Sequence, residues 1–383
     1  MKILFIGSSS DFHIDLWTKF FTKKHKVYLF SEKENYLGNK PFENVHIFYS
    51  SGVFGFFLNF FKSSSHKLFQ LNKLVSAYIY GIQINRIIKK NNIDIVHAHN
   101  LYQGYVASYI KKEIPVVFTP MGSDVIIHAQ KNFIYRYMAK KAFKRANIVT
   151  SDSKLLQKSG FKVGAKNNKN FIIQNGVDSS IFYPKENNIK NGYGIKDDEI
   201  LIFSPRGLDK IYNIDLILEA ISLLKDQGYK VKCMIAYGFG EQNLLSLKKI
   251  ISNRGIEDNI IWIGGLRYEE MPNFYNASDI VISIPSSDSS PKSVYEAMFC
   301  KKLVIVSDLD WVYERLDYED CVQKVNHKNP EDIAAVIIKL ITNHNLAELM
   351  SENALEVAKK YYDYEENMKK MEELMLAEVS NYK

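Results

Sequence analysis

Short runs of β-branched and aromatic residues alternate with longer helical stretches along this 383-residue chain. In the first half the pattern predicts strands at 2–6, 27–30, 93–98, 116–119 and 148–151, and helices at 15–21 and 71–90. Because strands that alternate with helices pair in parallel, this half is expected to form a parallel sheet covered by helices.

The second half repeats the alternation. Its predicted strands are 200–204, 231–236, 260–263, 280–283 and 303–306, and its helices are 216–224, 242–253, 271–277, 293–300 and 330–342, with a final helix over 346–381 that breaks near 361–364. A chain of this length exceeds what one hydrophobic core supports. We expect two facing, Rossmann-like doubly wound domains, 1–185 and 195–361, joined by the polar segment 184–194. Ligands are expected at the carboxyl ends of the strands, in the cleft between the domains.

Charge is divided unevenly between the halves. Residues 1–185 hold 27 Lys and Arg against 10 Asp and Glu, a net of +17, whereas residues 186–383 have a net of −10. A basic half attracts a phosphorylated or anionic surface, and the hypothesis drawn from it is an anionic membrane. Nucleic acid is the rival partner, but the chain has no zinc-finger spacing, RNP-type motif or basic helix ahead of heptads, so no nucleic acid is expected.

Other features place the chain among cytoplasmic proteins. Cys233, Cys300 and Cys321 have neither disulfide-like nor metal-like spacing and are expected to be reduced core residues. The apolar run 3–6 is too short for a signal peptide, and no stretch of about 18 apolar residues predicts a spanning helix. We therefore expect a cytoplasmic protein, peripheral at most on the inner face of the membrane.

Two loops that follow predicted strands could hold phosphate. Gly7-Ser8-Ser9-Ser10 follows the first strand, where main-chain N–H groups can bind a phosphate, although an ordinary loop explains it equally well. It lacks the Gly-x-Gly-x-x-Gly pattern of nicotinamide enzymes. After strand 200–204, Arg206 offers a planar fork and Lys210 a point charge, which suits a leaving diphosphate; a solvated surface pair is the alternative.

The segment 288–298 is the strongest local feature. A loop rich in small residues leads into a helix whose first turns hold Ser293 and Glu296. Its N–H groups could bind an anion in a site lined by Ser290, Pro291, Lys292 and Ser293, and the Glu296 carboxylate could accept hydrogen bonds from two ribose hydroxyls. The alternative is a capping box, in which Ser293 is the N-cap and Glu296 reaches back to it.

The second half resembles the nucleotide-binding domain of glycosyltransferase family 4, whose members are retaining enzymes with the GT-B fold. That family has a Glu-x7-Glu element ending in Glu-Ala-Met-Ala-Cys-Gly. Here Asp288-x7-Glu296 is followed by Ala297-Met298-Phe299-Cys300-Lys301. Further similar elements occur in order over roughly residues 93–380: His97-Ala98-His99-Asn100, Met121-Gly122-Ser123-Asp124, Asn175-Gly176-Val177-Asp178, Asn276-Ala277-Ser278-Asp279 and Tyr361-Tyr362-Asp363-Tyr364.

The resemblance implies a role for each matching residue. Glu296 would bind the ribose, and Arg206 with Lys210 would hold the diphosphate. Gly7 would let the first loop approach the donor phosphate; His99, Asp124 and Asp288 match residues near the reacting sugar. A C-terminal helix, about 362–383, would return to the first domain. No cofactor or metal is expected: His97 and His99 share one face of a strand but have no third ligand nearby.

Some positions depart from the family pattern. The first carboxylate is Asp288 rather than Glu, so its reach toward a sugar hydroxyl is one methylene shorter. Met121 stands where histidine is common, and Lys301 and Leu303 replace the usual Gly and Pro. The spacing from Arg206 to Lys210 is also one residue shorter than usual.

The implied reaction transfers a sugar, a hexose or N-acetylhexosamine, from a nucleoside diphosphate sugar to an acceptor hydroxyl with retention. UDP is the favoured nucleotide, and a glycolipid or surface-polysaccharide precursor is the expected acceptor. The alternatives are a sugar-nucleotide epimerase and a non-catalytic sugar-nucleotide-binding protein. The basic first half would choose the acceptor. Its aromatic segment Phe54–Phe61 and its basic segment 140–145 could meet a membrane, although the former could equally be a core helix.

Overall fold

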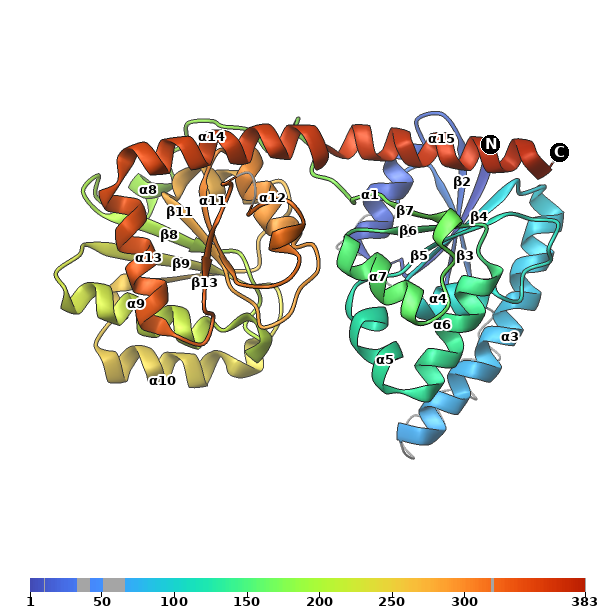
Figure 1. The fold of residues 1–383 in the computed structure, drawn as a ribbon, viewed down its shortest axis with the longest axis horizontal. Coiled ribbons are helices and arrows are strands. Elements are labelled where there is room, and N and C mark those ends of the chain that lie inside the picture. Colours follow the sequence, from blue (N-terminus) through green and yellow to red (C-terminus); the bar gives the residue numbers. More distant parts are fainter. Residues whose placement is uncertain (10, 33–41, 51–65, 318–319, 383) are drawn as a thin grey trace. The chain divides into compact units, whose positions relative to one another are not determined.

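The computed structural model describes residues 1–9, 11–32, 42–50, 66–317 and 320–382. The chain divides into two compact units. Unit 1 comprises Met1–Asn175 and Glu365–Lys383, and unit 2 comprises Gly176–Tyr364 (Figure 1). The aromatic segment Phe54–Phe61 lies outside the described residues.

Unit 1 is built on a parallel sheet, as predicted. Among its described residues the strand order is β3-β2-β1-β4-β5-β6-β7, and all neighbours pair in parallel. The strands are β1 (Lys2–Ile6), β2 (Lys26–Ser31), β3 (Val45–Tyr49), β4 (Ile95–His99), β5 (Val116–Thr119), β6 (Ile148–Ser151) and β7 (Asn170–Ile172). Its helices are α1 (Phe12–Phe21), α3 (His66–Asn91), α4 (Leu101–Ala107), the π-helix η1 (Asp124–His128), α5 (Ala129–Lys131), α6 (Phe133–Arg145), α7 (Lys154–Lys162), the 3₁₀ turn η2 (Asn167–Lys169) and α15 (Tyr364–Tyr382).

Strand alternation decides what each face of the unit 1 sheet buries. In β1, Leu4 and Ile6 pack into the cluster formed with α3, α4 and α6. The intervening Phe5 faces the other side, where its ring lies 5.8 Å from that of Phe21 on α1. The sheet is therefore buried on both faces, which is why its strands are almost wholly apolar.

Unit 2 has a second parallel sheet, with strand order β10-β9-β8-β11-β12-β13. The strands are β8 (Ile200–Ser204), β9 (Val231–Ala236), β10 (Ile260–Gly264), β11 (Ile280–Ser283), β12 (Leu303–Ser307) and β13 (Gln323–Val325). Its helices are α8 (Ile189–Gly192), α9 (Ile214–Asp226), α10 (Leu244–Arg254), α11 (Met271–Ala277), α12 (Lys292–Phe299), α13 (Pro330–Thr342) and α14 (His344–Tyr361), with 3₁₀ turns η3 (Lys210–Tyr212), η4 (Glu241–Asn243), η5 (Glu257–Asn259) and η6 (Val312–Glu314).

The two faces of the unit 2 sheet form separate cores. Leu201 and Phe203 of β8 pack with α11, α12 and α14, whereas Ile202 packs with α9, α10 and α13. Both sheets have the strand order of a Rossmann fold, in which successive strands are added first on one side of the first strand and then on the other. The expectation of an α/β protein with two Rossmann-like units is confirmed.

The chain enters unit 2 at Gly176, eight residues ahead of the polar segment expected as a linker. Val177 pairs there with the returning segment: its N–H donates to Tyr362 (2.8 Å) and its carbonyl accepts from Tyr364 (3.0 Å). Gly176 has a φ of +72°, and a Cβ there would lie 2.5 Å from the Tyr364 Cα. Residues 176–194 belong to unit 2, where Lys190 forms an ion pair with Asp279 (2.9 Å).

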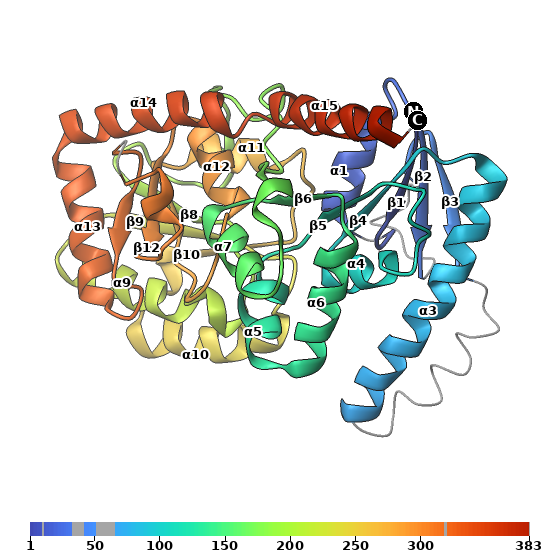
Figure 2. The same cartoon turned by 45° about the vertical axis from the view of Figure 1, so that its right-hand side comes forward.

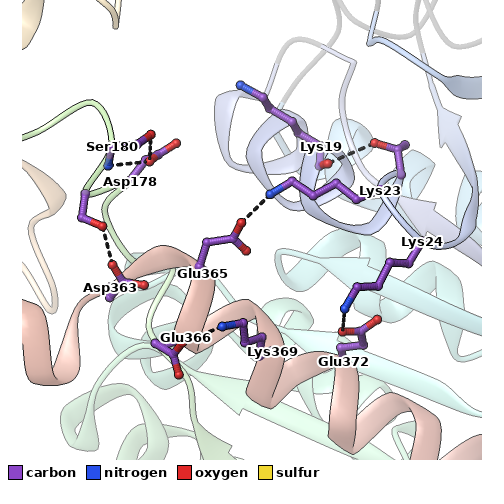
Figure 3. Close-up of polar contacts among 12 residues, drawn as sticks. Lys19, Lys23, Lys24, Asp178, Ser180, Asp363, Glu365, Glu366, Lys369 and Glu372 are labelled. Atoms are coloured by element: carbon purple, nitrogen blue, oxygen red, sulfur yellow. Dashed lines mark hydrogen bonds and ion pairs between the residues drawn. The ribbon is translucent and has the colours of Figure 1, made fainter.

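The last helix, α15, belongs to unit 1. Figure 3 shows charged contacts that attach it to the turn after α1. Lys23 forms an ion pair with Glu365, and Lys24 lies 3.6 Å from the Glu372 carboxylate. Glu372 also contacts the His25 ring at 2.6 Å, with both side chains largely buried. Met368, Met371 and Met375 are buried on the same helix, so α15 is held by its apolar side chains as well as by charge.

Within the described part of the chain, no single helix is long and apolar enough to cross a membrane. Taken together, α13 and α14 would pass by length and composition, but they meet at a bend of 98°. Their apolar side chains, including Ile333, Ile337 and Ala354, are part of the unit 2 cores.

Candidate functional site

The predicted site residues gather at the same topological position in each unit. In unit 1 this is the point between β1 and β4, where Gly7 and His99 lie; in unit 2 it is the point between β8 and β11, where Arg206 and Asp288 lie. Open α/β sheets bind ligands at the carboxyl ends of the strands beside such a point. Each unit therefore places its candidate residues where its fold is suited to a ligand.

Arg206 is the centre of the unit 2 site. It follows β8, and its guanidinium donates to Asp288 Oδ2 (2.8 Å) and to Ser293 Oγ (3.1 Å). The guanidinium carbon also lies 4.6 Å from the centre of the Tyr212 ring. Arg206 and Asp288 are each less than one-fifth exposed. These contacts fix the plane of the guanidinium, which is what bidentate recognition of phosphate oxygens requires.

Asp288 organises the loop after β11 as well as Arg206. Its Oδ1 accepts hydrogen bonds from the main-chain N–H groups of Ser289 (2.8 Å) and Ser290 (3.4 Å), while Oδ2 accepts from Arg206. Ser290 Oγ in turn lies 3.0 Å from the Tyr295 hydroxyl. Both Asp288 oxygens thus have protein partners, and the carboxylate ties the loop to Arg206.

The capping box considered for Ser293 and Glu296 is not formed. Helix α12 begins one residue earlier than predicted, at Lys292, and its N-cap is Pro291, which makes no side-chain capping bond. Ser293 Oγ instead accepts the hydrogen bond from Arg206, and Glu296 Oε2 accepts one from the Tyr275 hydroxyl (2.8 Å). Ser293 and Glu296 are therefore engaged in tertiary contacts rather than in stabilising the end of the helix.

Burial sets the charge state of the two ionisable groups on α12. Glu296 is 5% exposed, and its desolvation raises its pKa, an effect that Lys292, Tyr275 and Arg206 partly oppose. Burial also lowers the pKa of Lys292 to about 8, with Glu296 and Asp178 opposing the shift. The Lys292 ammonium lies 4.6 Å from the centre of the Tyr268 ring. A cation and a carboxylate thus share a mostly apolar, aromatic surrounding behind the loop.

Lys210 does not join this cluster. It begins the 3₁₀ turn η3 and is exposed, and it makes no ion pair with any residue that the structure describes. The other predicted donor residues, Ser290, Pro291, Lys292 and Ser293, lie in one run of chain beside Arg206.

In unit 1, His97 and His99 lie on one face of β4, as their spacing predicted. Their ring centres are 4.3 Å apart, and the ring of Trp17 lies 4.9 Å from each. Both histidines are almost fully buried. Burial lowers the pKa of His97 to about 3 and that of His99 well below its usual value, so both rings are neutral at pH 7.

The two histidines differ in their partners. His97 Nε2 lies 2.8 Å from the Thr119 hydroxyl, which lies 2.6 Å from that of Thr150. Neither ring nitrogen of His99 has a hydrogen-bond partner among the described residues. A buried polar group without a partner is costly, and such groups are found where a ligand supplies the partner.

Asp124 lies beside the start of α4, the helix that follows β4. It begins η1, and its Oδ2 accepts hydrogen bonds from the N–H groups of Leu101 (2.6 Å) and Met121 (3.4 Å). Burial raises the pKa of Asp124 to about 7 although these N–H groups oppose the shift. The carboxyl group is therefore much more easily protonated near neutral pH than an exposed aspartate.

Gly7 has a packing reason to be glycine. A Cβ at this position would lie 2.5 Å from the Ile14 Cδ1, so a larger residue would require the buried Ile14 side chain to shift. The Gly7 N–H donates to the Phe30 carbonyl (3.1 Å) and is therefore engaged within the sheet.

Sequence reasoning missed the aromatic and amide groups that support the site. Tyr212 and Tyr275 contact Arg206 and Glu296, and Asn213 donates to the Ile284 carbonyl (2.7 Å) and lies 3.0 Å from Ser286 Oγ. Asn213 has a φ of +53°, a conformation that asparagine tolerates better than most residues, which is the one local signal it offers.

No group of three or more His, Cys, Asp or Glu side chains is arranged for a metal ion within the described ranges. The unit 2 site combines the fixed guanidinium of Arg206, the N–H groups at the start of α12 and the buried Glu296 carboxylate, which is bound by Tyr275. Such a set suits an anionic group joined to a hydroxylated one.

Family models match both units. The model for glycosyl transferases group 1 matches residues 185–357, and the model for glycosyl transferase 4-like domains matches residues 2–153. An uncharacterised glycosyltransferase of Methanocaldococcus jannaschii is 28% identical over 300 residues, which is 76% of this chain and 77% of that protein. The alpha-monoglucosyldiacylglycerol synthase of Streptococcus pneumoniae is 25% identical over 230 residues, covering 55% of this chain and 51% of that protein.

Solved structures agree on the fold. The Anabaena protein HepE, in complex with UDP, has a TM-score of 0.78 at 15% identity and covers 98% of this chain and 100% of its own. The sucrose-phosphate synthase of Thermosynechococcus elongatus has a TM-score of 0.82 at 14% identity, with full coverage of both chains. Together with the family models in their order along the chain, these matches show that the chain is a glycosyltransferase of family 4 with the GT-B fold.

Proposed function

We propose that this glycosyltransferase transfers a hexose or N-acetylhexosamine from a UDP-sugar to a hydroxyl of a glycolipid or surface-polysaccharide precursor, with retention at the anomeric carbon. The UDP complex of HepE supports the choice of nucleotide. The similarity to a monoglucosyldiacylglycerol synthase supports a lipid-linked acceptor. Unit 2, with the C-terminal part of the chain up to about residue 361, would bind the donor, and unit 1 the acceptor.

The observation that carries the proposal is the cluster of Arg206, Asp288 and Ser293 at the switch point of unit 2. Asp288 and Ser293 hold the guanidinium in one orientation at the carboxyl end of β8. The eight-residue helix α12 begins beside this guanidinium. A diphosphate there would meet a planar cation and helix N–H groups together, and Glu296, one turn further on, would accept ribose hydroxyls.

The chemical difficulty of the reaction is the departing diphosphate and the oxocarbenium-like sugar. Arg206 and the N–H groups in the first turn of α12 would stabilise the negative charge as the glycosidic bond breaks. In a front-face path the acceptor hydroxyl attacks from the side on which the diphosphate leaves. The leaving phosphate oxygen takes the acceptor proton, and the configuration is retained without a second carboxylate.

In unit 1 we assign neutral hydrogen bonding to His99 and Asp124. The His99 ring is uncharged at pH 7 and has two nitrogens available to one donor and one acceptor, which matches a sugar hydroxyl. A protonated Asp124 would also donate a hydrogen bond, whereas its ionised form only accepts. Gly7 would let the loop after β1 lie close to the donor phosphate, and Lys210 would add a mobile charge.

A thermal-shift panel tests the nucleotide, because a ligand that binds the folded state raises its apparent stability. UDP is expected to raise the Tm more than GDP or ADP, and Arg206→Ala is expected to abolish the shift. Lys210→Ala serves as the matched cation control and should retain most of it. A wild-type protein that responds to none of the three nucleotides would contradict the proposal.

Transfer itself needs a second assay with UDP-glucose and UDP-N-acetylglucosamine. Consumption of the sugar nucleotide that depends on an added glycolipid supports the proposal, and nuclear magnetic resonance of the product reports retention. Conversion of the sugar nucleotide without any acceptor would indicate an epimerase. Binding with no turnover over a panel of lipid-linked acceptors would favour a non-catalytic binding protein.

A further inference from the structure

The outward face of α6 combines aromatic and cationic side chains. Phe133 is 80% exposed and Tyr137 is 46% exposed, one turn further along the helix. The exposed cations of the same helix and its preceding residues are Lys131, Arg136, Lys140, Lys141 and Lys144. The opposite face, with Met138, Ala139, Ala142 and Phe143, is buried in unit 1. One face of helix α6 thus packs in the core of unit 1, and the other exposes apolar side chains to solvent.

Helix α3 exposes a similar face. Val75, Tyr78 and Ile82 are 58%, 56% and 39% exposed, and their spacing of three and four residues puts them on one side of the helix. The same side continues with cations, since Arg86, Lys89 and Lys90 are also exposed. Exposed apolar side chains beside cations suit the boundary between lipid headgroups and acyl chains.

A chain of tyrosine rings joins the two helices across α4. Tyr78 of α3 lies 5.5 Å from Tyr109, Tyr109 lies 5.5 Å from Tyr105, and Tyr105 lies 6.0 Å from Tyr137 of α6. Figure 2 shows α4 between α3 and α6 within unit 1. We refer to the exposed side chains of α3 and α6 named above, with Tyr109, as the α3–α6 face.

The charge of this part of unit 1 is strongly one-sided. Residues 66–145 contain 13 Lys and Arg against three Asp and Glu. Two of the three acids are engaged away from the helix faces: Asp94 accepts a hydrogen bond from the Lys2 N–H (2.8 Å), and Asp124 accepts from Leu101 (2.6 Å). The third, Glu113, lies in the loop after α4. Within residues 66–145, little acidic charge therefore offsets the exposed cations of α3 and α6.

We propose that the α3–α6 face docks on the headgroup region of an anionic lipid bilayer, with Phe133, Tyr137 and Val75 entering the interface and the lysines meeting the lipid phosphates. This deepens the acceptor part of the proposed function and does not depend on the identity of the donor. A lipid surface fits better than a nucleic acid because the protruding groups include Val75 and Ile82, which have no ring to stack on a base.

Flotation of the full chain with phosphatidylcholine vesicles, with and without phosphatidylglycerol, tests the proposal. We expect binding only to the anionic vesicles. Two double variants test the face: Lys140→Gln with Lys141→Gln, and Phe133→Ser with Tyr137→Ser. Each should lower the membrane partition coefficient roughly tenfold or more, because interfacial cations and buried apolar groups both contribute to binding. The lysine variant should also weaken the salt dependence of binding.

Helix α10 of unit 2 provides matched controls. It exposes Leu245, at 76%, together with Lys248 and Lys249. Lys248→Gln with Lys249→Gln changes the charge as much as the α6 lysine pair, and Leu245→Ser removes one exposed apolar side chain. Both should leave vesicle binding unchanged. All variants are also tested for the UDP-dependent rise in Tm, which the α3–α6 variants should keep.

Three results would overturn the proposal: wild-type protein that does not float with anionic vesicles, α10 variants that lose binding as much as the α3–α6 variants, or preferential capture by a single-stranded oligonucleotide that competes with the vesicles. Failure of the donor hypothesis is seen separately. A protein that floats normally but shows no stabilisation by UDP would leave the docking surface in place and remove the proposed donor.

Discussion

Units 1 and 2 place polar groups at the same topological point, but in opposite electrostatic conditions. In unit 2, Arg206 and Asp288 are charged and paired at 2.8 Å, and Ser293 completes the contact. In unit 1, His99 is kept neutral by burial, and Asp124 is raised to a pKa of about 7. A charged, compensated site is suited to hold an anion, whereas a desolvated, neutral site is suited to uncharged hydroxyl groups.

The comparison explains why one fold can serve two kinds of ligand. Both sheets supply main-chain geometry at the ends of their strands, and the side chains decide the charge. Substitutions at the two sites test this difference in charge.

Arg206→Ala should have the largest effect, because it removes the fixed cation of unit 2. We expect kcat/KM for transfer to fall roughly 10²–10³-fold, the usual loss when one preorganised donor to a developing negative charge is removed. Steady-state kinetics with UDP-sugar measure it, and Lys210→Ala is the control, expected to lose much less because Lys210 is exposed. Equal losses in the two variants would mean that the paired state of Arg206 has no special role.

Asp124→Asn tests the desolvated carboxyl of unit 1. The native pKa of about 7 lies above the usual value of 3.8, so the folded state favours the protonated form. The contribution of Asp124 to stability is therefore fully present below about pH 4 and is lost as the pH rises through about 7. The Tm of the wild type minus that of the variant should fall across this window and level off above it.

The difference between the two proteins is the quantity to measure, because the neutral histidines shift stability in the other direction. His97, with a native pKa of about 3, is protonated more easily in the unfolded chain, so its contribution is lost as the pH falls below about 6.5. Parallel Tm curves for the wild type and Asp124→Asn would contradict the raised pKa of Asp124.

Gly104→Ala and Gly207→Ala compare steric tolerance in the two units. A Cβ at Gly104 would lie 2.4 Å from the Phe118 ring, which is fully buried, and one at Gly207 would lie 2.2 Å from the Phe239 ring, which is 51% exposed. We expect overpacking by Gly104→Ala to destabilise unit 1 by about 1–3 kcal/mol. The higher helix propensity of alanine should offset up to about 1 kcal/mol of this loss. Gly207→Ala should stay within about 0.5 kcal/mol because Phe239 can turn away.

Urea unfolding followed by circular dichroism measures both glycine variants against the wild type. A larger loss for Gly207→Ala than for Gly104→Ala would show that the loop after β9 is as rigid as the core of unit 1.

Tyr275→Phe should have the smallest effect. It removes the hydroxyl that donates to Glu296 at 2.8 Å, and the net loss of one such hydrogen bond is about 1 kcal/mol. The affinity for UDP should fall by a few-fold if Glu296 holds the ribose, which isothermal titration calorimetry can measure. An unchanged affinity with reduced stability would place Tyr275 in the fold alone.

Much of the fold followed from the sequence, and the exceptions share a physical reason. The runs Ile200–Ser204 and Ile280–Ser283 were predicted with their observed bounds, since buried parallel strands are continuous apolar stretches. Three strands were missed: β3, β7 and β13. They lie at the edges of their sheets and are partly exposed, and β7 and β13 have only three residues each, too few for a sustained apolar pattern.

The sequence by itself determined the residue types that meet at each strand end, and it identified the family through their order. What only the tertiary structure decided is how those residues are used. Ser293 and Glu296 have the spacing of a capping box, yet Arg206 and Tyr275 engage them instead. Asp124 and His99 are ordinary titratable residues in the sequence, but burial keeps His99 uncharged at pH 7 and raises the pKa of Asp124 to about 7. Spacing is a local property, whereas pairing and desolvation depend on segments that lie far apart in the chain.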